Sequence, residues 1–456
     1  MPKARVIPPR FKAPTEHTVR SHMSMDAQLT TARRGFDHIP DHRKRTGKIT
    51  LSDGLMSVLA MFILKDPSLL AFDERRQADA GNLKKIFGIK QVPCDTHMRE
   101  LLDPVNPELL RPMFRSVFSQ FQRGKALEPF AFYQGHYLVS IDGTGSFSSC
   151  TLKSDSCSVK KHRNGTETYY QQVLGAAIVH PDFQEVIPLC PEMIQKQDGD
   201  TKNDCERNAA RRLLPKVRED HPRLKLIVIE DGLSSNGPHI KDLKEHNMRF
   251  ILGAKPGDHP LLFGNLSEAI KQGTATTFTQ IDGKSPEIIH TFCFLNETLL
   301  NQTHLDLKVN LLVYEEYNTK TEKLQRFSWV TDFPITQENA FTLMRGGRAR
   351  WKIENETFNT LKNQGYNLEH NYGLGKEHLS EVFVMLMMLA FLIDQTQQLT
   401  SALFRAVWQK VGSKRALWEQ QRNLFHCFDI DSMALLYTAI VNGFRIGSLD
   451  IIYDDA

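Results

Sequence analysis

The chain has 456 residues and a mass of 52.2 kDa, with 41% hydrophobic and 24% charged residues. These ordinary globular values exclude a disordered polymer, a collagen-like fibre and a coiled-coil rod. The length has room for about three domains, whose cores need neither disulfides nor a metal ion to fold. The seven cysteines are odd in number and contain no Cys-x-x-Cys pair, which argues against a disulfide framework or a zinc ribbon and favours a reducing cytosol.

The basic residues gather at the beginning of the chain. Residues 1–50 contain eleven lysines and arginines against four acids, a net charge of +7 that leaves −3 for the remainder. We interpret this segment as an irregular basic arm, which favours a nucleic-acid partner, with a solvated tail as the alternative. The longest apolar run, residues 382–393, is too short to span a bilayer and predicts a buried helix, so no membrane partner is expected.

Residues 51–130 predict a small helical domain. Apolar residues recur there at helical spacing, as at Leu109, Met113 and Val117. The pattern fits a DNA-binding domain and a plain helical bundle equally well.

Residues 131–257 alternate between strand-like and helix-like patterns. Three strands come first, and then helices and further strands alternate. The expected elements are strands 137–142, 173–179 and 185–189, helix 204–217, strand 224–232, helix 237–246 and strand 249–254. This order is typical of a ribonuclease-H-like α/β fold, in which a mixed five-stranded sheet has flanking helices.

The pattern returns to β structure over residues 258–335. Strands are expected at 286–294, 307–314 and 324–331, the last two joined in a hairpin around residues 318–320. Residues 336–400 are again helical, and residues 401–456 add a further helical region. We therefore expect a ribonuclease-H-like core, 131–257 and 336–400, interrupted by a β-rich insertion.

Three acids stand where this fold would bring carboxylates together. Asp142 ends the first strand, Asp231 ends the fourth, and Glu354 lies on the helix after the insertion. An isolated aspartate at a strand end is usually a cap, but three acids at these positions favour a metal site. Two Mg²⁺ ions bound by carboxylates can stabilise both the attacking and the leaving oxygen of a phosphodiester.

The motifs around these acids resemble a known family. Residues 328–332 (SWVTD), residues 348–354 (RARWKIE) and then Phe358 with residues 361–362 resemble the C-terminal signature of bacterial insertion-sequence transposases. This is the DDE type with a β-rich insertion before the catalytic glutamate. The strand-Asp-Gly elements at Asp142 and Asp231 match its other two positions, and the resemblance covers residues 138–392.

The resemblance implies Mg²⁺-dependent DNA cleavage and strand transfer at the terminal inverted repeats of a mobile element. Asp142, Asp231 and Glu354 would be catalytic and hold two Mg²⁺ ions, with Mn²⁺ as a substitute. The implied partners are double-stranded DNA, both element ends and target, and a second copy of the chain on DNA. A small-molecule substrate is not expected, and the implied location is the bacterial cytoplasm, associated with the nucleoid.

The sequence also departs from the family. Gly347 stands where many relatives have a tyrosine, and Leu361 stands where they have a lysine, with Lys362 one residue later. Arg350 precedes Glu354 by four residues, so both would share one helix face. The expected DNA-binding residues are Arg345, Arg348, Arg350, Lys352, Lys362, Lys160 and Lys161.

Three further residues have two interpretations each. Trp329 could stack on an unpaired base, although core packing is the more common role of a strand tryptophan. His162 could contact DNA or be an ordinary loop residue. Glu206 could be an auxiliary acid or only a favourable first-turn glutamate.

Two other functions remain open. One is a nuclease of the same fold that only hydrolyses DNA. The other is a DNA-binding regulator with a decayed site, against which the complete set of three acids argues.

Overall fold

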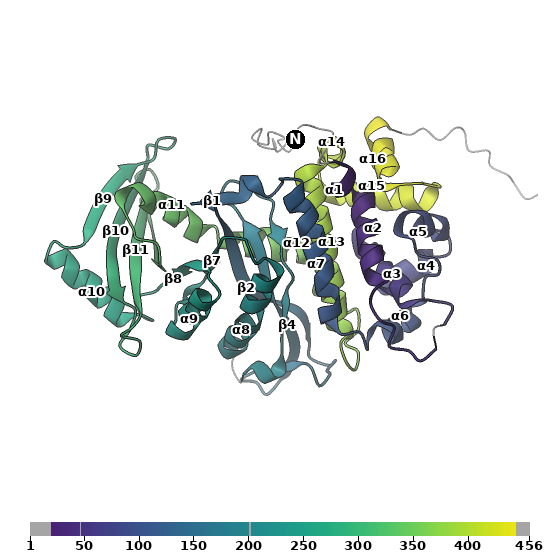
Figure 1. Cartoon of the computed structure of the whole chain (residues 1–456), viewed down its shortest axis with the longest axis horizontal. Coiled ribbons are helices and arrows are strands. Elements are labelled where there is room, and N and C mark those ends of the chain that lie inside the picture. The colour runs from purple at the N-terminus through teal and green to yellow at the C-terminus, as the bar shows by residue number, and fades with distance from the viewer. Residues whose placement is uncertain (1–19, 46, 200–201, 444–456) are drawn as a thin grey trace, which may run out of the picture. The chain divides into compact units, whose positions relative to one another are not determined.

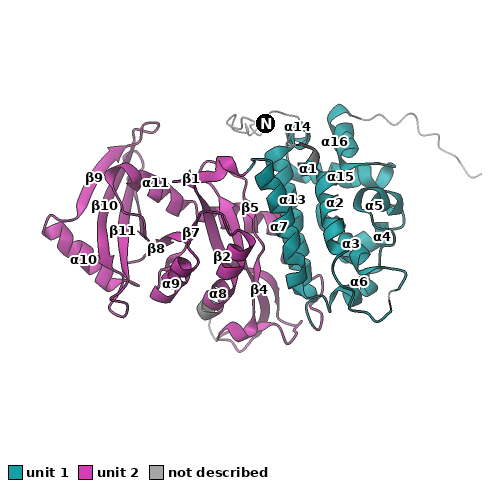
Figure 2. Cartoon of the chain, viewed as in Figure 1, with its two compact units in different colours: residues 1–126, 364–367, 377–456 teal, residues 127–363, 368–376 magenta. Residues whose placement is uncertain are grey.

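The computed structural model describes residues 20–45, 47–199 and 202–443 (Figure 1). The chain divides into two compact units (Figure 2). Unit 1 comprises Met1–Ala126, Gln364–Asn367 and Glu377–Ala456, and unit 2 comprises Leu127–Asn363 and Leu368–Lys376.

Unit 1 is helical, and its centre is a pair of helices from distant parts of the chain. All fourteen residues of α3 are buried, and it packs against α13, with the rings of Phe62 and Phe383 6.2 Å apart. An apolar helix of this kind is stable only when it is enclosed on all sides. The principal helices are α2 (Met25–Phe36), α3 (Leu51–Leu64), α4 (Leu69–Arg75), α5 (Ala80–Phe87), α6 (Asp95–Leu102), α7 (Arg111–Arg123), α13 (Leu379–Thr400), α14 (Ala402–Val411), α15 (Lys414–Cys427) and α16 (Met433–Asn442).

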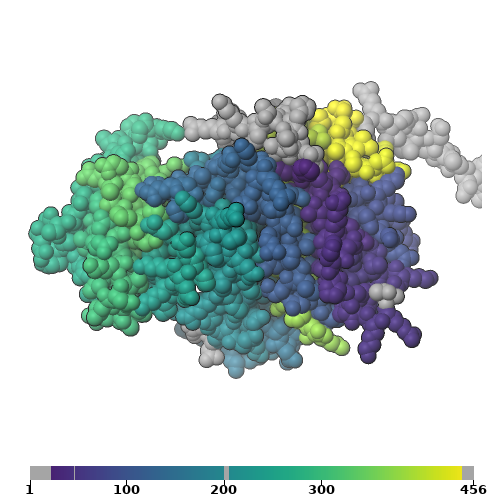
Figure 3. Space-filling model, viewed as in Figure 1, coloured from purple at the N-terminus to yellow at the C-terminus, as the bar shows by residue number. Residues whose placement is uncertain are grey.

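The prediction of an irregular arm through residue 50 is wrong for Arg20–Met23 and Met25–Phe36, which form the helices α1 and α2. Helix α2 begins at the cap Ser24 and buries Met25, Leu29 and Phe36 along one face. Its polar and basic residues hid this helical period in the sequence. In Figure 3 the purple N-terminal residues adjoin the yellow C-terminal ones, in agreement with the backbone N–H of Met433 donating to a carboxylate oxygen of Asp26 at 2.8 Å. Residues 1–19 of the arm lie outside the described residues.

Helix α13 belongs to unit 1, whereas the sequence assigned residues 336–400 to the catalytic core. Helix α13 belongs to unit 1 because it packs against α3 and α7, which are helices of that unit. By length and composition α13 could cross a membrane, and α3 with α4 would count as a second candidate only as one sharply bent span. In the structure, 89% of the 18-residue apolar stretch of α13 is buried inside the protein.

Unit 2 contains one large mixed sheet, as the predicted α/β class requires. The strands follow the order β3-β4-β2-β7-β8-β12-β11-β10-β9, and the short strands β1, β5 and β6 bring the total to 12. The bounds are β1 (Ala131–Tyr133), β2 (His136–Ser149), β3 (Ser158–Lys161), β4 (Glu167–Val179), β5 (Ile187–Pro188), β6 (Glu192–Ile194), β7 (Leu226–Glu230), β8 (Arg249–Gly253), β9 (Thr276–Ile281), β10 (Ile288–Leu299), β11 (Lys308–Asn318) and β12 (Lys323–Thr331).

The β-rich insertion extends this sheet. Strand β12 pairs with β8 in antiparallel fashion, and β11, β10 and β9 continue outward from it. The expected hairpin is formed by β11 and β12, in which Asn318 pairs with Lys323. The insertion also contains a helix that the sequence analysis did not predict, α10 (Pro260–Lys271). Outside the insertion, β3 is a strand that was not predicted either.

Helices cover both faces of the sheet next to β2 and β7. On one face lie α8 (Lys202–Asp220) and α9 (Gly237–Glu245). The other face carries α11 (Gln337–Arg348), a π-helical turn (Ile353–Phe358) and α12 (Asn359–Asn363). The hydroxyl of Ser140 on β2 donates to the carbonyl of Arg350 at 3.0 Å and ties this second layer to the sheet.

Candidate active site

Two of the predicted acids come from neighbouring strands. Asp231 directly follows β7 as expected, but the prediction that Asp142 ends its strand is wrong, because β2 continues to Ser149. Strands β2 and β7 are parallel, and Ser140 pairs with Ile229. Continuing this register by two residues brings Asp142 beside Asp231. Both residues line one pocket. Asp231 also caps the next turn, since its Oδ1 accepts from the N–H of Leu233 at 2.9 Å.

Glu354 reaches the same region from the helical layer above the sheet. It lies in the π-helical turn, a rare conformation that is frequent at functional sites. One nitrogen of Arg350, Nη1, donates to Asp142 Oδ2 at 3.0 Å and to Glu354 Oε1 at 2.9 Å. The guanidinium therefore joins the strand carboxylate to the helix carboxylate, and its carbon also lies 4.3 Å from the centre of the Trp351 ring.

The Asp142 carboxyl is electrostatically perturbed. Burial and the neighbouring Glu354 carboxyl raise the pKa of Asp142 to about 7, against the opposing effect of the Arg350 cation. Two carboxylates in contact share one arginine, so the cluster keeps an excess of negative charge when both are ionised. An excess of this kind favours binding of a further cation.

The three predicted acids have ligand atoms suited to a divalent metal ion, but their side chains are not arranged around one ion. Asp142, Asp231 and Glu354 offer only carboxylate oxygens, the ligands that Mg²⁺ and Mn²⁺ prefer. Across residues 20–45, 47–199 and 202–443, no three His, Cys, Asp or Glu side chains are close enough to enclose one ion. Arg350 lies between Asp142 and Glu354, so its guanidinium would have to move for both to bind one cation.

Further acids adjoin the site on the α8 and α9 face. A Cβ atom placed on Gly143 would lie 2.7 Å from Oε1 of Glu206, so the carboxyl group of Glu206 lies directly against β2. Glu206 and Glu230 line the same pocket as the two aspartates. Glu206 therefore lies beside the two aspartates, where an auxiliary acid would be needed. Its role as an auxiliary acid stays a prediction.

Sequence reasoning missed the buried pair formed by Glu230 and His239. Their side chains are 5% and 6% exposed, and His239 Nε2 lies 2.5 Å from Glu230 Oε2. Burial alone would lower the pKa of His239, but the Glu230 carboxylate outweighs it and the pKa is raised. The available signal was an acid inside an otherwise apolar strand, next to Asp231.

Of the seven predicted DNA-binding residues, Arg350 is the one that contacts the acids. The other cations on this layer bind elsewhere within unit 2. Arg345 pairs with Asp182, Arg348 with Glu316 and Lys362 with Glu369, while Lys352 donates to the carbonyl of Phe183. Lys160 and Lys161 are exposed on β3. His162 is an exposed residue whose Nε2 lies 2.8 Å from the hydroxyl of Thr168.

The glycine that departs from the family pattern has a structural reason. A Cβ atom on Gly347 would lie 2.4 Å from Nε1 of Trp329. Trp329 is only 5% exposed, so the core-packing interpretation of this tryptophan is confirmed. The two residues fit each other, and a tyrosine at position 347 would collide with the indole.

Comparison with protein-family models gives no match for this chain, and comparison with curated proteins gives none either. The likeness to a transposase family therefore stays a resemblance of the sequence motifs.

Proposed function

We propose that the chain is a DDE-type transposase that cleaves DNA and joins the cut end to a target with the help of divalent metal ions. The observation that carries the proposal is the placement of Asp142 and Asp231 in one pocket, with Glu354 connected to Asp142 through Arg350. Asp142 lies on β2 and Asp231 directly follows the neighbouring parallel strand β7. Arg350 links Asp142 to Glu354, which follows Asp231 by 123 residues in the sequence (354 − 231).

The strand order supports a ribonuclease-H-like core within the larger sheet. Strand β2 pairs with β4 in antiparallel fashion and with β7 in parallel, and β7 is parallel to β8. Strands β5 and β6 add a third antiparallel element beside β4. This is the arrangement expected of three meandering strands followed by two strand-helix units. Strands β9 to β12 then occupy the place of the family's insertion.

The acids and Arg350 would have different roles in the reaction. Asp142, Asp231 and Glu354 would hold the metal ions, which when bound activate the attacking oxygen and stabilise the leaving one. Arg350 would release the carboxylates and bind a phosphate of the DNA, because a guanidinium matches phosphate as well as carboxylate.

The test compares strand transfer with simple nicking. Purified protein is incubated with Mg²⁺, a supercoiled plasmid and a labelled duplex that ends in the element's inverted repeat. Joined products support the transposase, nicking without joining supports a nuclease of the same fold, and DNA binding without either reaction supports a regulator. Glu354→Gln should abolish both reactions, and normal joining by this variant would refute the site.

The remaining parts of the proposal follow from the same resemblance. The DNA partners are the element ends and the target, and the active species is a dimer assembled on DNA. The cellular location is the bacterial cytoplasm, at the nucleoid. Gel filtration with and without duplex DNA measures the assembly directly.

A further inference from the structure

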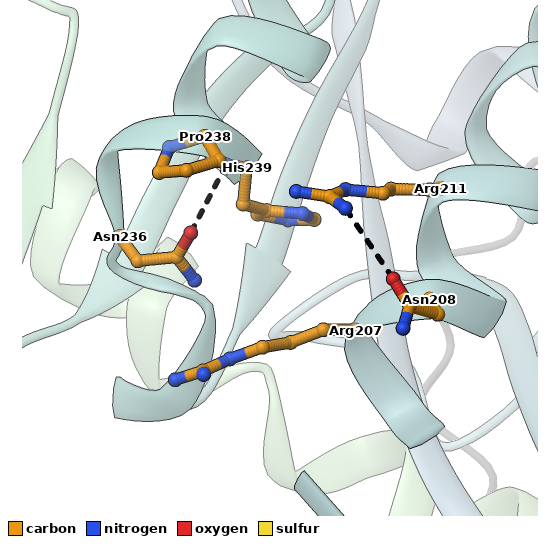
Figure 4. A pocket seen from close by; sticks show the side chains of 6 residues that line it. All are labelled: Arg207, Asn208, Arg211, Asn236, Pro238 and His239. Carbon is orange, nitrogen blue, oxygen red and sulfur yellow. Dashed lines mark hydrogen bonds between the residues drawn. The ribbon is translucent and has the colours of Figure 1, made fainter. Parts of the chain in front are cut away.

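A second cavity lies beside the acid pocket, between α8 and the beginning of α9. Its volume is about 280 Å³. The lining residues are Arg207, Asn208, Arg211, Asn236, Pro238 and His239. Figure 4 shows Arg211 extending from α8 toward His239 in the first turn of α9, and Arg207 extending toward the turn that precedes α9. At this end of α9, Oδ1 of Asn236 accepts from the N–H of His239 at 3.1 Å.

The lining is suited to an anion. It has two arginines, two amides and a histidine but no carboxylate among its six residues. Arg207 and Arg211 are four residues apart on one helix, so both guanidinium groups can serve one ligand. The beginning of the nine-residue helix α9 adds the partial positive charge of its backbone amides.

Of the two arginines, Arg211 makes only a long, exposed ion pair. Arg211 is 54% exposed, and its Nε lies 3.5 Å from Asp242. Arg207 donates to the carbonyl of Leu233 at 3.4 Å. Their neighbour Arg212 is different, since Nε lies 2.8 Å from the buried Glu192 and the guanidinium also bonds Asp198. A long, exposed ion pair such as that of Arg211 contributes little and can be exchanged for a ligand.

The cavity adjoins the proposed site of chemistry. Arg207 and His239 line it and also line the pocket that contains Asp142 and Asp231. A chain of phosphates that enters the acid pocket would therefore pass directly beside this cavity.

We propose that the cavity of Arg207, Arg211 and His239 binds a backbone phosphate of the DNA strand that is cut, close to the scissile bond. This inference rests on the proposed function, because it takes DNA as the substrate. It adds a binding subsite on the α8 and α9 face, opposite the layer that carries Arg350. The ligand chemistry is a phosphate group, supplied by the DNA backbone.

The experiment measures DNA affinity by fluorescence anisotropy in EDTA, with a labelled duplex, at several salt concentrations. Arg207→Gln and Arg211→Gln should each raise the Kd about tenfold and lower the slope of log Kd against log salt by about one. The matched control is Arg223→Gln, which removes the same charge from an exposed position in the turn between α8 and β7. The control should leave both quantities unchanged. Circular dichroism checks that each variant is folded.

A second arm identifies the phosphate. After the cut position has been mapped with native protein, neutral methylphosphonates replace single phosphates along the cut strand. One position near the cut should weaken binding by native protein and have no effect on Arg211→Gln. Inorganic phosphate at constant ionic strength should compete no better than chloride, because a free anion lacks the neighbouring contacts of the DNA strand.

The outcomes separate the two proposals. If native protein binds and cuts DNA but both arginine variants behave like Arg223→Gln, the subsite is refuted and the proposed function stands. Strong competition by inorganic phosphate alone, with no sensitive backbone position, also refutes the DNA subsite. If native protein neither binds nor cuts DNA, both proposals fall.

Discussion

Each unit contains a cluster of opposite charges, and the two clusters are built differently. In unit 1, Lys65 Nζ lies 2.6 Å from Asp394 Oδ2, and both side chains are 0% exposed. Lys65 also lies 4.2 Å from the centre of the Tyr366 ring and 4.4 Å from that of Trp418. In unit 2, Arg350 is 13% exposed, Asp142 24% and Glu354 38%.

The difference lies in how completely each charge is matched. Lys65 faces one carboxylate, donates to two backbone carbonyls, and Asp394 accepts a further bond from Tyr366 at 2.5 Å. In the unit 2 cluster, one arginine serves two carboxylates that water can reach. A matched and sealed pair has only a structural role, whereas an excess of partly exposed carboxylate can bind a metal ion.

The largest effect is expected on catalysis. Asp142→Asn should reduce DNA cleavage on the order of 10⁴-fold, equivalent to about 5 kcal/mol of activation free energy, because the proposed function makes this carboxylate a metal ligand. Gel assays of nicking in Mg²⁺ measure the rate. The control is Glu369→Gln, an exposed acid of unit 2 that pairs with Lys362 and should cut normally. Equal rates in the two variants would remove Asp142 from the mechanism.

The sealed pair should dominate stability. Asp394→Asn leaves Lys65 buried without its counter-ion, so the free energy of unfolding should fall by about 3–5 kcal/mol in urea titrations. Replacing both residues, Lys65→Met with Asp394→Leu, should recover much of this loss. Glu419→Gln breaks an exposed pair with Arg415 and should change stability by less than about 0.5 kcal/mol. Similar losses from Asp394→Asn and Glu419→Gln would contradict the contrast between sealed and exposed pairs.

Packing of α11 against the sheet should have an intermediate effect on the free energy of unfolding. Gly347→Ala places a Cβ atom against Trp329 and should lower the free energy of unfolding by about 1–3 kcal/mol, with a change in tryptophan fluorescence. Gly264→Ala is the matched control, because nothing lies within 4 Å of its Cβ and alanine favours the helix α10. If both changes are neutral, the indole moves freely and the collision argument is wrong.

The smallest effect is the pH dependence of stability in EDTA. The pKa of Asp142 is raised from 3.8 to about 7 in the folded protein, so its contribution is full at low pH and is lost as the pH rises through 7. Asp142→Asn removes this loss and should gain about 1–2 kcal/mol over native protein between pH 5.5 and pH 8, after allowance for solvent screening. Parallel urea stability curves for the two proteins would show that Asp142 is not perturbed.

The sequence predicted the elements on which the site depends. The apolar run before Asp231 becomes β7, the run before Asp142 becomes part of β2, and the helix between them becomes α8. The same patterns failed where polar residues covered a buried face, as in α2, and where a helix interrupted a β-rich segment, as in α10. Local periodicity reports an element well when one face is clearly apolar, and poorly when it is not.

The sequence by itself determined which residues could do chemistry, because residue type and strand-end position are local properties. Only the tertiary structure decided which of them meet. Arg350 reaches two acids while Arg345, Arg348 and Lys362 bind other carboxylates, and Glu230 pairs with His239 across two elements. Partner choice depends on strand register and helix packing over hundreds of residues, which no short stretch of sequence encodes.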